Sequence, residues 1–218
     1  MTDKNENKIT ITDIDGNVYN TITIGRQVWM AENLMATRFR NGDSLYKIPG
    51  INKSNKHQAV YDPAYAEYSE LGYVSKYYNW YSVADVRNIA PLGWHVPTAE
   101  EWTMLIIFLG GEGAAGPKLK GQFKYPRRDW NKKATNESGF NGLPFGYRKN
   151  SNGEFYEYGE DGSWWSSTKG QHTPIRLSLF GTLGGASLIE NNIHIGDGVS
   201  IRCVKDYVDW RNYKPNFG

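Results

Sequence analysis

Cysteine is almost missing from this chain of 218 residues, in which Cys203 stands alone. A single cysteine excludes an internal disulfide and a zinc site built from several cysteines. Excess charge is missing too, because 25 basic and 23 acidic residues leave a formal net charge of +2. We therefore expect no nucleic-acid partner, since no strong long-range field attracts a polyanion. No apolar run approaches the roughly 20 residues that span a bilayer, so we expect no transmembrane segment.

Aromatic residues and glycine are abundant, with 8 Trp, 15 Tyr, 8 Phe and 24 Gly. Aromatic side chains bury a large area per residue, and glycine permits sharp loops around them. This mixture favours a loop-rich α+β domain over a helical bundle. No break in composition and no internal repeat divides the chain. We therefore expect one domain over residues 8–206, between a disordered N-terminal tail (1–7) and a C-terminal tail (207–218) that is mobile or lies on the surface.

One helix is marked by agreeing local signals. Thr98 and Glu101 have the Thr-x-x-Glu spacing of a capping box. Gly110 and Gly111 can end the helix, because glycine adopts the left-handed conformation without strain. The face that we expect to be buried is formed by Trp102, Leu105, Ile106 and Leu109. The aromatic segment 77–86 has a similar period, so a second helix is predicted there, with Tyr77, Trp80, Tyr81 and Ala84 inside.

The remaining elements are predicted to be strands and loops. Alternation and turn signals predict strands over residues 9–14, 18–19, 28–30, 164–168, 175–180 and 199–204. Residues 43–70 lack periodicity and are predicted to form a long loop, and residues 113–162 to form loops with short strands. Within the pair Trp164-Trp165, alternation should bury one ring and leave the other nearer the surface.

Several motifs resemble chemical sites only superficially. Residues 13–17 begin like a calcium loop but lack the later ligands of an EF-hand, so a β-turn is favoured. Residues 111–118 differ from a phosphate loop, because Pro117 removes an amide donor and the lysine is displaced by one position. Cys203 lies among alternating apolar residues, which favours an inert buried thiol.

The histidines and carboxylates also lack a catalytic pattern. His57, His95, His172 and His194 have no metal-binding spacing, and we expect His95 to be a hydrogen-bonded structural residue. Acidic residues at the start of the predicted helix favour its dipole and need no catalytic explanation. We therefore expect no cofactor, no metal and no enzymatic activity, although an uncharacterised enzyme stays an alternative.

Eight segments, in order, resemble the Fibrobacter succinogenes major paralogous domain. They include Trp29-Met30-Ala31-Glu32-Asn33-Leu34 and Gly93-Trp94-His95-Val96-Pro97, and the resemblance covers residues 9–206. The full set is residues 13–19, 29–34, 77–85, 93–102, 116–120, 138–148, 164–168 and 200–206. The chain departs from the family in two places: Ala59-Val60-Tyr61 lacks the cysteine that many members carry there to pair with the equivalent of Cys203, and Pro117 replaces the usual glycine.

The resemblance implies a C-type-lectin-like fold, related to the domain of formylglycine-generating enzymes. Two helices would flank a mixed, mostly antiparallel sheet, and long loops would carry the ligand surface. Oxidases with this fold need a second cysteine to bind copper, which this chain lacks. Lectins of this fold often bind sugar through calcium with a Glu-Pro-Asn or Gln-Pro-Asp signature, and neither tripeptide occurs here.

The family is typical of secreted proteins and surface lipoproteins of gut and fibre-degrading bacteria. Relatives with this fold include variable receptor-binding proteins, some of them encoded by phages beside diversity-generating retroelements. The resemblance therefore implies an extracellular or cell-surface location, on a bacterium or a phage particle. Residues 1–7 themselves lack the apolar core of an export signal.

A ligand surface is predicted in the second half of the chain, where paralogues differ. Aromatic faces beside amide and imidazole groups suit sugar rings or a protein epitope. The residues predicted to bind are Tyr156, Tyr158, Trp164, His172, Asn191, Asn192 and His194. The leading hypothesis is a non-enzymatic module that binds a glycan or a surface protein. The alternative is a structural subunit of a surface fibre or phage tail, and a homo-oligomer is compatible with either.

Overall fold

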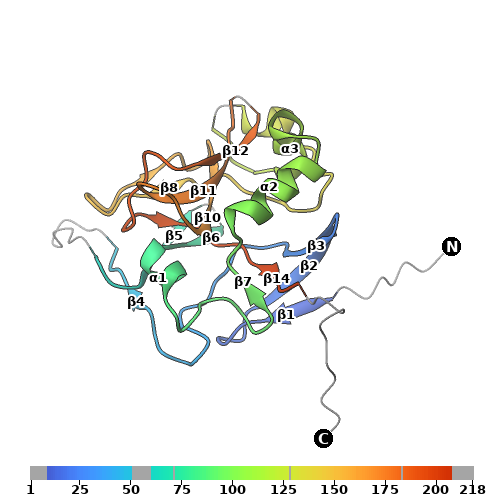
Figure 1. Ribbon diagram of the computed structural model, residues 1–218. Coiled ribbons are helices and arrows are strands. Elements are labelled where there is room, and N and C mark those ends of the chain that lie inside the picture. Colours follow the sequence, from blue (N-terminus) through green and yellow to red (C-terminus); the bar gives the residue numbers. More distant parts are fainter. Residues whose placement is uncertain (1–8, 51–59, 71, 128, 183, 208–218) are drawn as a thin grey trace, which may run out of the picture.

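The arrangement of the chain is known from a computed structural model, which describes residues 9–50, 60–70, 72–127, 129–182 and 184–207 (Figure 1). The predicted N-terminal tail lies outside these residues, and of the predicted C-terminal tail only Tyr207 is described. Short helices and three β-sheets make the fold β-rich, in keeping with the predicted α+β class. Over the described ranges, no helix has the length and apolar character that crossing a membrane requires.

The first sheet joins the two ends of the described chain. Its strands pair antiparallel throughout. Their order is β1 (Thr10–Thr12), β2 (Val18–Ile24), β3 (Gln27–Met30), β14 (Val204–Lys205) and β7 (Trp94–His95). The hairpin between β1 and β2 turns at the predicted place. There the Asp13 carboxylate accepts bonds from the backbone N–H groups of Asp15 and Asn17, which confirms the β-turn interpretation of this segment.

The other two sheets contain the remaining described strands. The six-stranded sheet has the order β4 (Tyr46–Lys47), β5 (Ala64–Glu70), β6 (Tyr73–Tyr78), β13 (Gly198–Val199), β8 (Tyr147–Arg148) and β9 (Phe155–Tyr156). Only its β4–β5 pair is parallel. The three-stranded sheet consists of β10 (Gly162–Lys169), β11 (Pro174–Leu179) and β12 (Ala186–Ile189). Residues 64–70 were expected to belong to a long loop, and this expectation is wrong, because residues 65–70 pair with β6 and Ala64 pairs with β4.

Helix α2 (Ala99–Phe108) confirms the first predicted helix. Both bonds of the capping box are present, since the Thr98 hydroxyl accepts from the Glu101 N–H and the Glu101 carboxylate accepts from the Thr98 N–H. The second predicted helix is shorter than expected. Tyr77 and Tyr78 end strand β6, and α1 covers only Trp80–Ala84 after the cap at Asn79.

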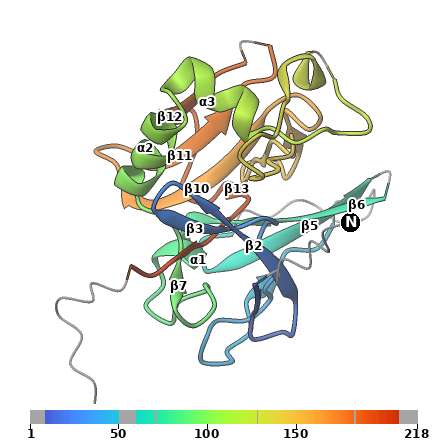
Figure 2. The same cartoon turned by 90° about the vertical axis from the view of Figure 1, so that its right-hand side faces the viewer.

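A third helix, α3 (Glu112–Leu119), lies where only loops and short strands were expected. It packs with α2 beside β12, on one side of the three-stranded sheet (Figures 1 and 2). A 3-10 turn, η1 (Trp130–Lys133), follows. The last predicted strand, residues 199–204, is divided. Gly198–Val199 belongs to the six-stranded sheet and Val204–Lys205 to the first, because the chain passes from one sheet to the other at the buried Arg202.

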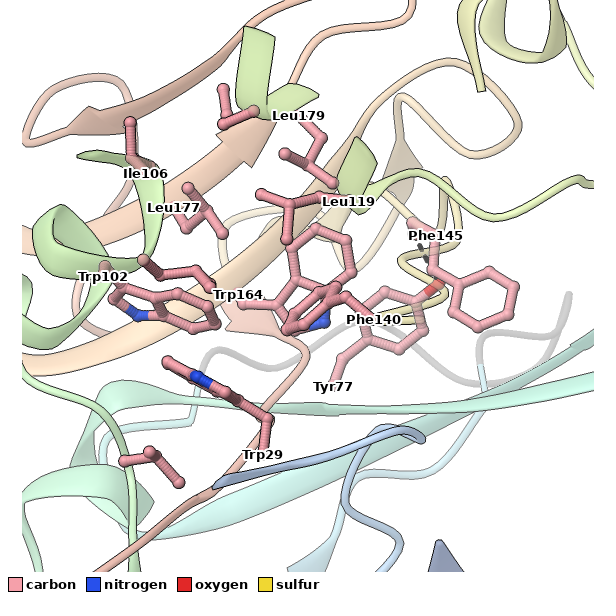
Figure 3. Packing of buried hydrophobic residues seen from close by; sticks show 14 of the residues in the cluster. Trp29, Tyr77, Trp102, Ile106, Leu119, Phe140, Phe145, Trp164, Leu177 and Leu179 are labelled. Carbon is pink, nitrogen blue, oxygen red and sulfur yellow. Dashed lines mark hydrogen bonds between the residues drawn. The ribbon is translucent and has the colours of Figure 1, made fainter. Parts of the chain in front are cut away.

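Two buried clusters form the core, and β10 lies between them. Trp164 packs in one cluster and Trp165 in the other, and both side chains are 0% exposed. The expectation that one of these rings lies near the surface is therefore wrong: alternation separates them, but each face of the strand is covered. In the cluster of Figure 3, the rings of Trp29 and Trp102 stack at 4.6 Å, and Phe140 meets both with its ring edge-on.

Candidate functional site

Two of the seven predicted binding residues lie in the core. Trp164 is fully buried, and its indole N–H donates to the Asn33 side chain at 2.8 Å. Tyr158 is 7% exposed and stacks on Phe145 at a ring distance of 5.8 Å. Neither ring has an open face for a ligand, so the prediction of an exposed binding role is wrong for both. The prediction was based on an aromatic residue after a glycine turn, and this pattern is also typical of residues that pack inward.

Three of the other predicted residues do lie together at one end of the three-stranded sheet. His172 stands in the β10–β11 turn, and Asn191 and Asn192 follow β12. The Glu190 carboxylate joins the two segments by accepting the backbone N–H of His172 at 2.7 Å. All three predicted residues are exposed. They form an open polar edge without an aromatic floor among the residues that the structure describes.

His194 and Tyr156 are placed separately. His194 is exposed, and the buried Asp197 fixes its backbone by accepting its N–H at 2.8 Å. Tyr156 is half-buried on β9, and its ring stacks on Tyr147 at 5.7 Å. The Tyr156 hydroxyl donates to Glu154 at 2.9 Å, so this predicted residue holds a carboxylate that faces solvent.

That carboxylate stands at the rim of a cleft of about 560 Å³ in the six-stranded sheet. The ring centroids of Tyr68 on β5 and Phe155 on β9 lie 4.5 Å apart in its floor. In a flat sheet, β5 and β9 would be four strand spacings apart, or about 19 Å. The sheet therefore curls strongly, and the cleft is its concave side. The cleft is lined by Ile48, Pro49, Gly50, Ala66, Glu67, Tyr68, Arg148, Gly153, Glu154 and Phe155.

Tight backbone geometry places these side chains. Gly153 has φ +75°, which lets the β8–β9 hairpin turn so that Glu154 and Phe155 follow directly. Gly198 on β13 lies between β6 and β8, and a Cβ there would come within 2.9 Å of Tyr77. The missing side chain thus lets Tyr77 and Arg148 lie on the same face of the sheet.

The charges of the cleft are largely balanced. Lys76 donates to Glu67 at 3.1 Å, and this bond, aided by Lys47, holds the pKa of the Glu67 carboxyl below its usual range. Glu154 accepts from the Asn152 amide as well as from Tyr156. Burial lowers the pKa of the Arg148 guanidinium, which is only 2% exposed. Glu67 and Lys76 point to the face of β5 that carries Tyr65, so the floor itself has Arg148 beside it and Glu154 at its rim. Such a surface can stack on a ring and accept bonds from hydroxyl or amide donors.

A family model described as the Fibrobacter succinogenes major domain matches residues 22–205. The chain belongs to this family. The match agrees with the resemblance read from the sequence motifs. No curated protein and no solved structure is significantly similar to the chain.

The Fibrobacter family motifs that the structure describes mostly build the interior. Asn33, from the motif at 29–34, accepts bonds through one amide oxygen from Trp164 and from Arg202. His95 lies between two carboxylates, with Nδ1 at 2.7 Å from Asp206 and Nε2 at 2.8 Å from Glu101. These carboxylates, Glu101 above all, raise the pKa of His95. Both ring nitrogens are occupied, which agrees with the predicted structural role.

The remaining motifs of this Fibrobacter-family chain also have structural roles. Lys118, in the segment that resembled a phosphate loop, donates to the Leu109 carbonyl at the end of α2. Cys203 is fully buried, and burial raises the pKa of its thiol. The described ranges contain no group of three or more His, Cys, Asp and Glu side chains that could hold a metal ion. His57 lies outside the described residues.

Proposed function

We propose that this chain is a non-enzymatic binding domain that presents the cleft of the six-stranded sheet to a glycan or a protein at a bacterial or phage surface. The observation that supports this most is the pairing of the Tyr68 and Phe155 rings in a concave, partly charged surface. A sugar ring or an aromatic side chain can stack on such a floor, while the exposed Glu154 at the rim accepts its donors.

The ionisation of Glu67 argues against a general acid at this position. General acid catalysis by a carboxyl group at neutral pH needs a raised pKa. The pKa of Glu67 is instead lowered by Lys76, so this group stays ionised.

The finer fold assignment is part of the same proposal. A C-type-lectin-like arrangement would place a ligand surface on irregular segments supported by a rigid core. The three-stranded sheet between two aromatic clusters is compatible with this arrangement. The polar edge at His172, Asn191 and Asn192 is then the second candidate surface.

An assembly subunit is the alternative, and one feature of α2 favours it. Met104, Ile107 and Phe108 lie on its outer side at i, i+3 and i+4, and they are 47%, 68% and 63% exposed. A helix with apolar residues on both faces is typical of a contact with another molecule.

A glycan array, run with and without a calcium chelator, tests the proposal. We expect binding that survives chelation, weakens at least about tenfold in Glu154→Ala and persists in His172→Ala, since a charged hydrogen bond contributes about 1.5–3 kcal/mol. If only His172→Ala lost binding, the binding site would be the polar edge at His172, Asn191 and Asn192 and not the cleft. No binding by the folded protein to any glycan on the array would favour the assembly subunit.

A further inference from the structure

The strand β1 is an open sheet edge. Among the residues that the structure describes, it is the outermost strand of the first sheet and pairs only with β2. Ile9 accepts a bond from Thr21, and Asp13 donates one to Asn17, so the odd-numbered residues direct their backbone groups towards β2. Because these directions alternate in an antiparallel strand, Thr10 and Thr12 direct their N–H and C=O groups outwards. Both residues are exposed.

Its short length apart, this edge lacks the side chains and irregularities that usually prevent pairing with another strand. Edge strands are commonly protected by a charged residue, a proline or a bulge. Residues 9–12, Ile-Thr-Ile-Thr, contain none of these, and their pairing with β2 is regular. Within residues 9–12 no charged side chain opposes self-pairing. The Ile9 side chain is 72% exposed at the start of the strand.

A pocket of about 320 Å³ adjoins the other end of β1. Its polar groups are already bonded: the Asp13 carboxylate accepts from the Tyr19 hydroxyl at 2.6 Å, and Arg40 donates to the Ala90 and Pro91 carbonyls. The pocket is therefore suited to an aliphatic group and not to an ion. The residues that line it are Thr12, Asp13, Ile14, Arg40, Ile89, Ala90, Pro91 and Leu92, of which Leu92 is 82% exposed.

Strand geometry relates these features to each other. If two copies of β1 pair antiparallel about a two-fold axis at Ile11, Thr10 of one copy faces Thr12 of the other, and their outward groups form four hydrogen bonds. Ile9 then lies opposite Asp13 of the second copy. Directly opposed residues share a face, with Cβ atoms about 4.5–5.5 Å apart. The Ile9 side chain would thus point to the face of the second copy where the Asp13 carboxylate and the pocket lie.

We propose that this chain forms a two-fold dimer through β1, in which Ile9 of each copy enters the pocket between residues 12–14 and 89–92 of the other. The occupant of the pocket is therefore a second copy, and each site is incomplete without it. A three-residue strand and one side chain bury less than the roughly 1,200–2,000 Å² of a stable interface. The dimer is accordingly weak, with a Kd of roughly 10–500 µM. The proposal is independent of the cleft.

Sedimentation velocity over about 5–500 µM protein tests the proposal. We expect a monomer–dimer equilibrium in the unchanged chain. Thr12→Pro removes one outward N–H and no bond to β2, so it should weaken the dimer at least tenfold, whereas Thr12→Val keeps the N–H and should dimerise normally. Circular dichroism and a thermal melt verify that the proline variant is folded.

A second pair of variants tests the pocket without changing the backbone. Ile9→Ser should weaken the dimer at least tenfold, and Val86→Ser, at an apolar side chain that is 99% exposed outside the pocket, should leave it unchanged. A monomer at every concentration would overturn the proposal. A dimer that both Thr12→Pro and Ile9→Ser leave intact would overturn it as well, because such a dimer must use another surface, such as the outer side of α2.

Discussion

Replacing Asn33 by alanine removes the acceptor of a charge in the core. The Asn33 amide oxygen accepts from Nη2 of Arg202 at 2.6 Å, from its Nε at 3.1 Å and from the Trp164 indole at 2.8 Å. The third guanidinium nitrogen donates to the Phe140 carbonyl. Arg202 is 2% exposed, and burial lowers its pKa to about 9, so it is charged at pH 7.

The loss can be worked out from these contacts. Leaving a buried charge without its partner costs about 3–5 kcal/mol. The Phe140 carbonyl remains, and the guanidinium carbon stays 4.2 Å from the Phe140 ring centroid, which reduces the loss, while the buried Trp164 N–H loses its acceptor, which adds to it. We therefore expect about 4 kcal/mol. A domain of this size loses about 2–4 °C of Tm per kcal/mol, which gives a decrease of about 8–16 °C. Total stability is about 5–15 kcal/mol, so the variant folds but is much weakened.

Guanidinium unfolding, followed by tryptophan fluorescence, measures the effect. The exposed Asn191→Ala is the matched control and should change the free energy of unfolding by less than about 0.5 kcal/mol. The double variant Asn33→Ala with Arg202→Met removes the charge together with its acceptor, so it should recover at least half of the loss. A loss below about 1 kcal/mol in Asn33→Ala, or simple additivity in the double variant, would refute the reasoning.

Three further predictions concern other parts of the fold. Because the pKa of His95 is higher in the folded chain, its stabilisation is complete below the unfolded value of about 6.5 and disappears as pH rises through the folded value. The Tm difference between the parent chain and His95→Gln should therefore shrink at alkaline pH, and a constant difference would contradict this. Gly146 has φ +58°, and a Cβ there would overlap the Tyr156 carbonyl, so Gly146→Ala should lower the free energy of unfolding by about 3 kcal/mol. Gly113 lies in open space on α3, so Gly113→Ala should raise the free energy of unfolding by about 0.5–1 kcal/mol. Equal effects of the two variants in chemical unfolding would be inconsistent with the packing. Cys203 should react with a thiol reagent only after denaturation, and rapid labelling of the native protein would show that it is accessible.

Sequence reasoning succeeded where the determining interactions are local. The α2 helix was predicted because Thr98 and Glu101 cap each other within four residues. The β1–β2 turn was predicted for the same reason, since Asp13 bonds to its own near neighbours. Helix α3 was missed because Gly113, Gly116 and Pro117 are weak helix formers, and its packing against α2 and β12 overrides that weakness.

The candidate site was harder to predict because it depends on tertiary packing. The alternation of side chains along β10 correctly predicted that Trp164 and Trp165 lie on opposite faces of the strand. It could not show that both faces are covered by other parts of the chain. The cleft joins residues 48–50, 66–68, 148 and 153–155, which come together only when the sheet curls. The one signal for the cleft in the sequence was the segment Gly153-Glu154-Phe155-Tyr156. Of its residues, only Tyr156 was predicted to bind a ligand.

The position of β14 has a consequence for biosynthesis. This strand, close to the end of the described chain, lies between β3 and β7 and is the only connection between them in the first sheet. A nascent chain that has emerged only as far as residue 203 still lacks this strand. The edges of β3 and β7 that pair with β14 then have no partner. The ribosome must therefore deliver nearly the whole domain before the sheet can close, and stalled or truncated products would expose strand edges that attract other chains.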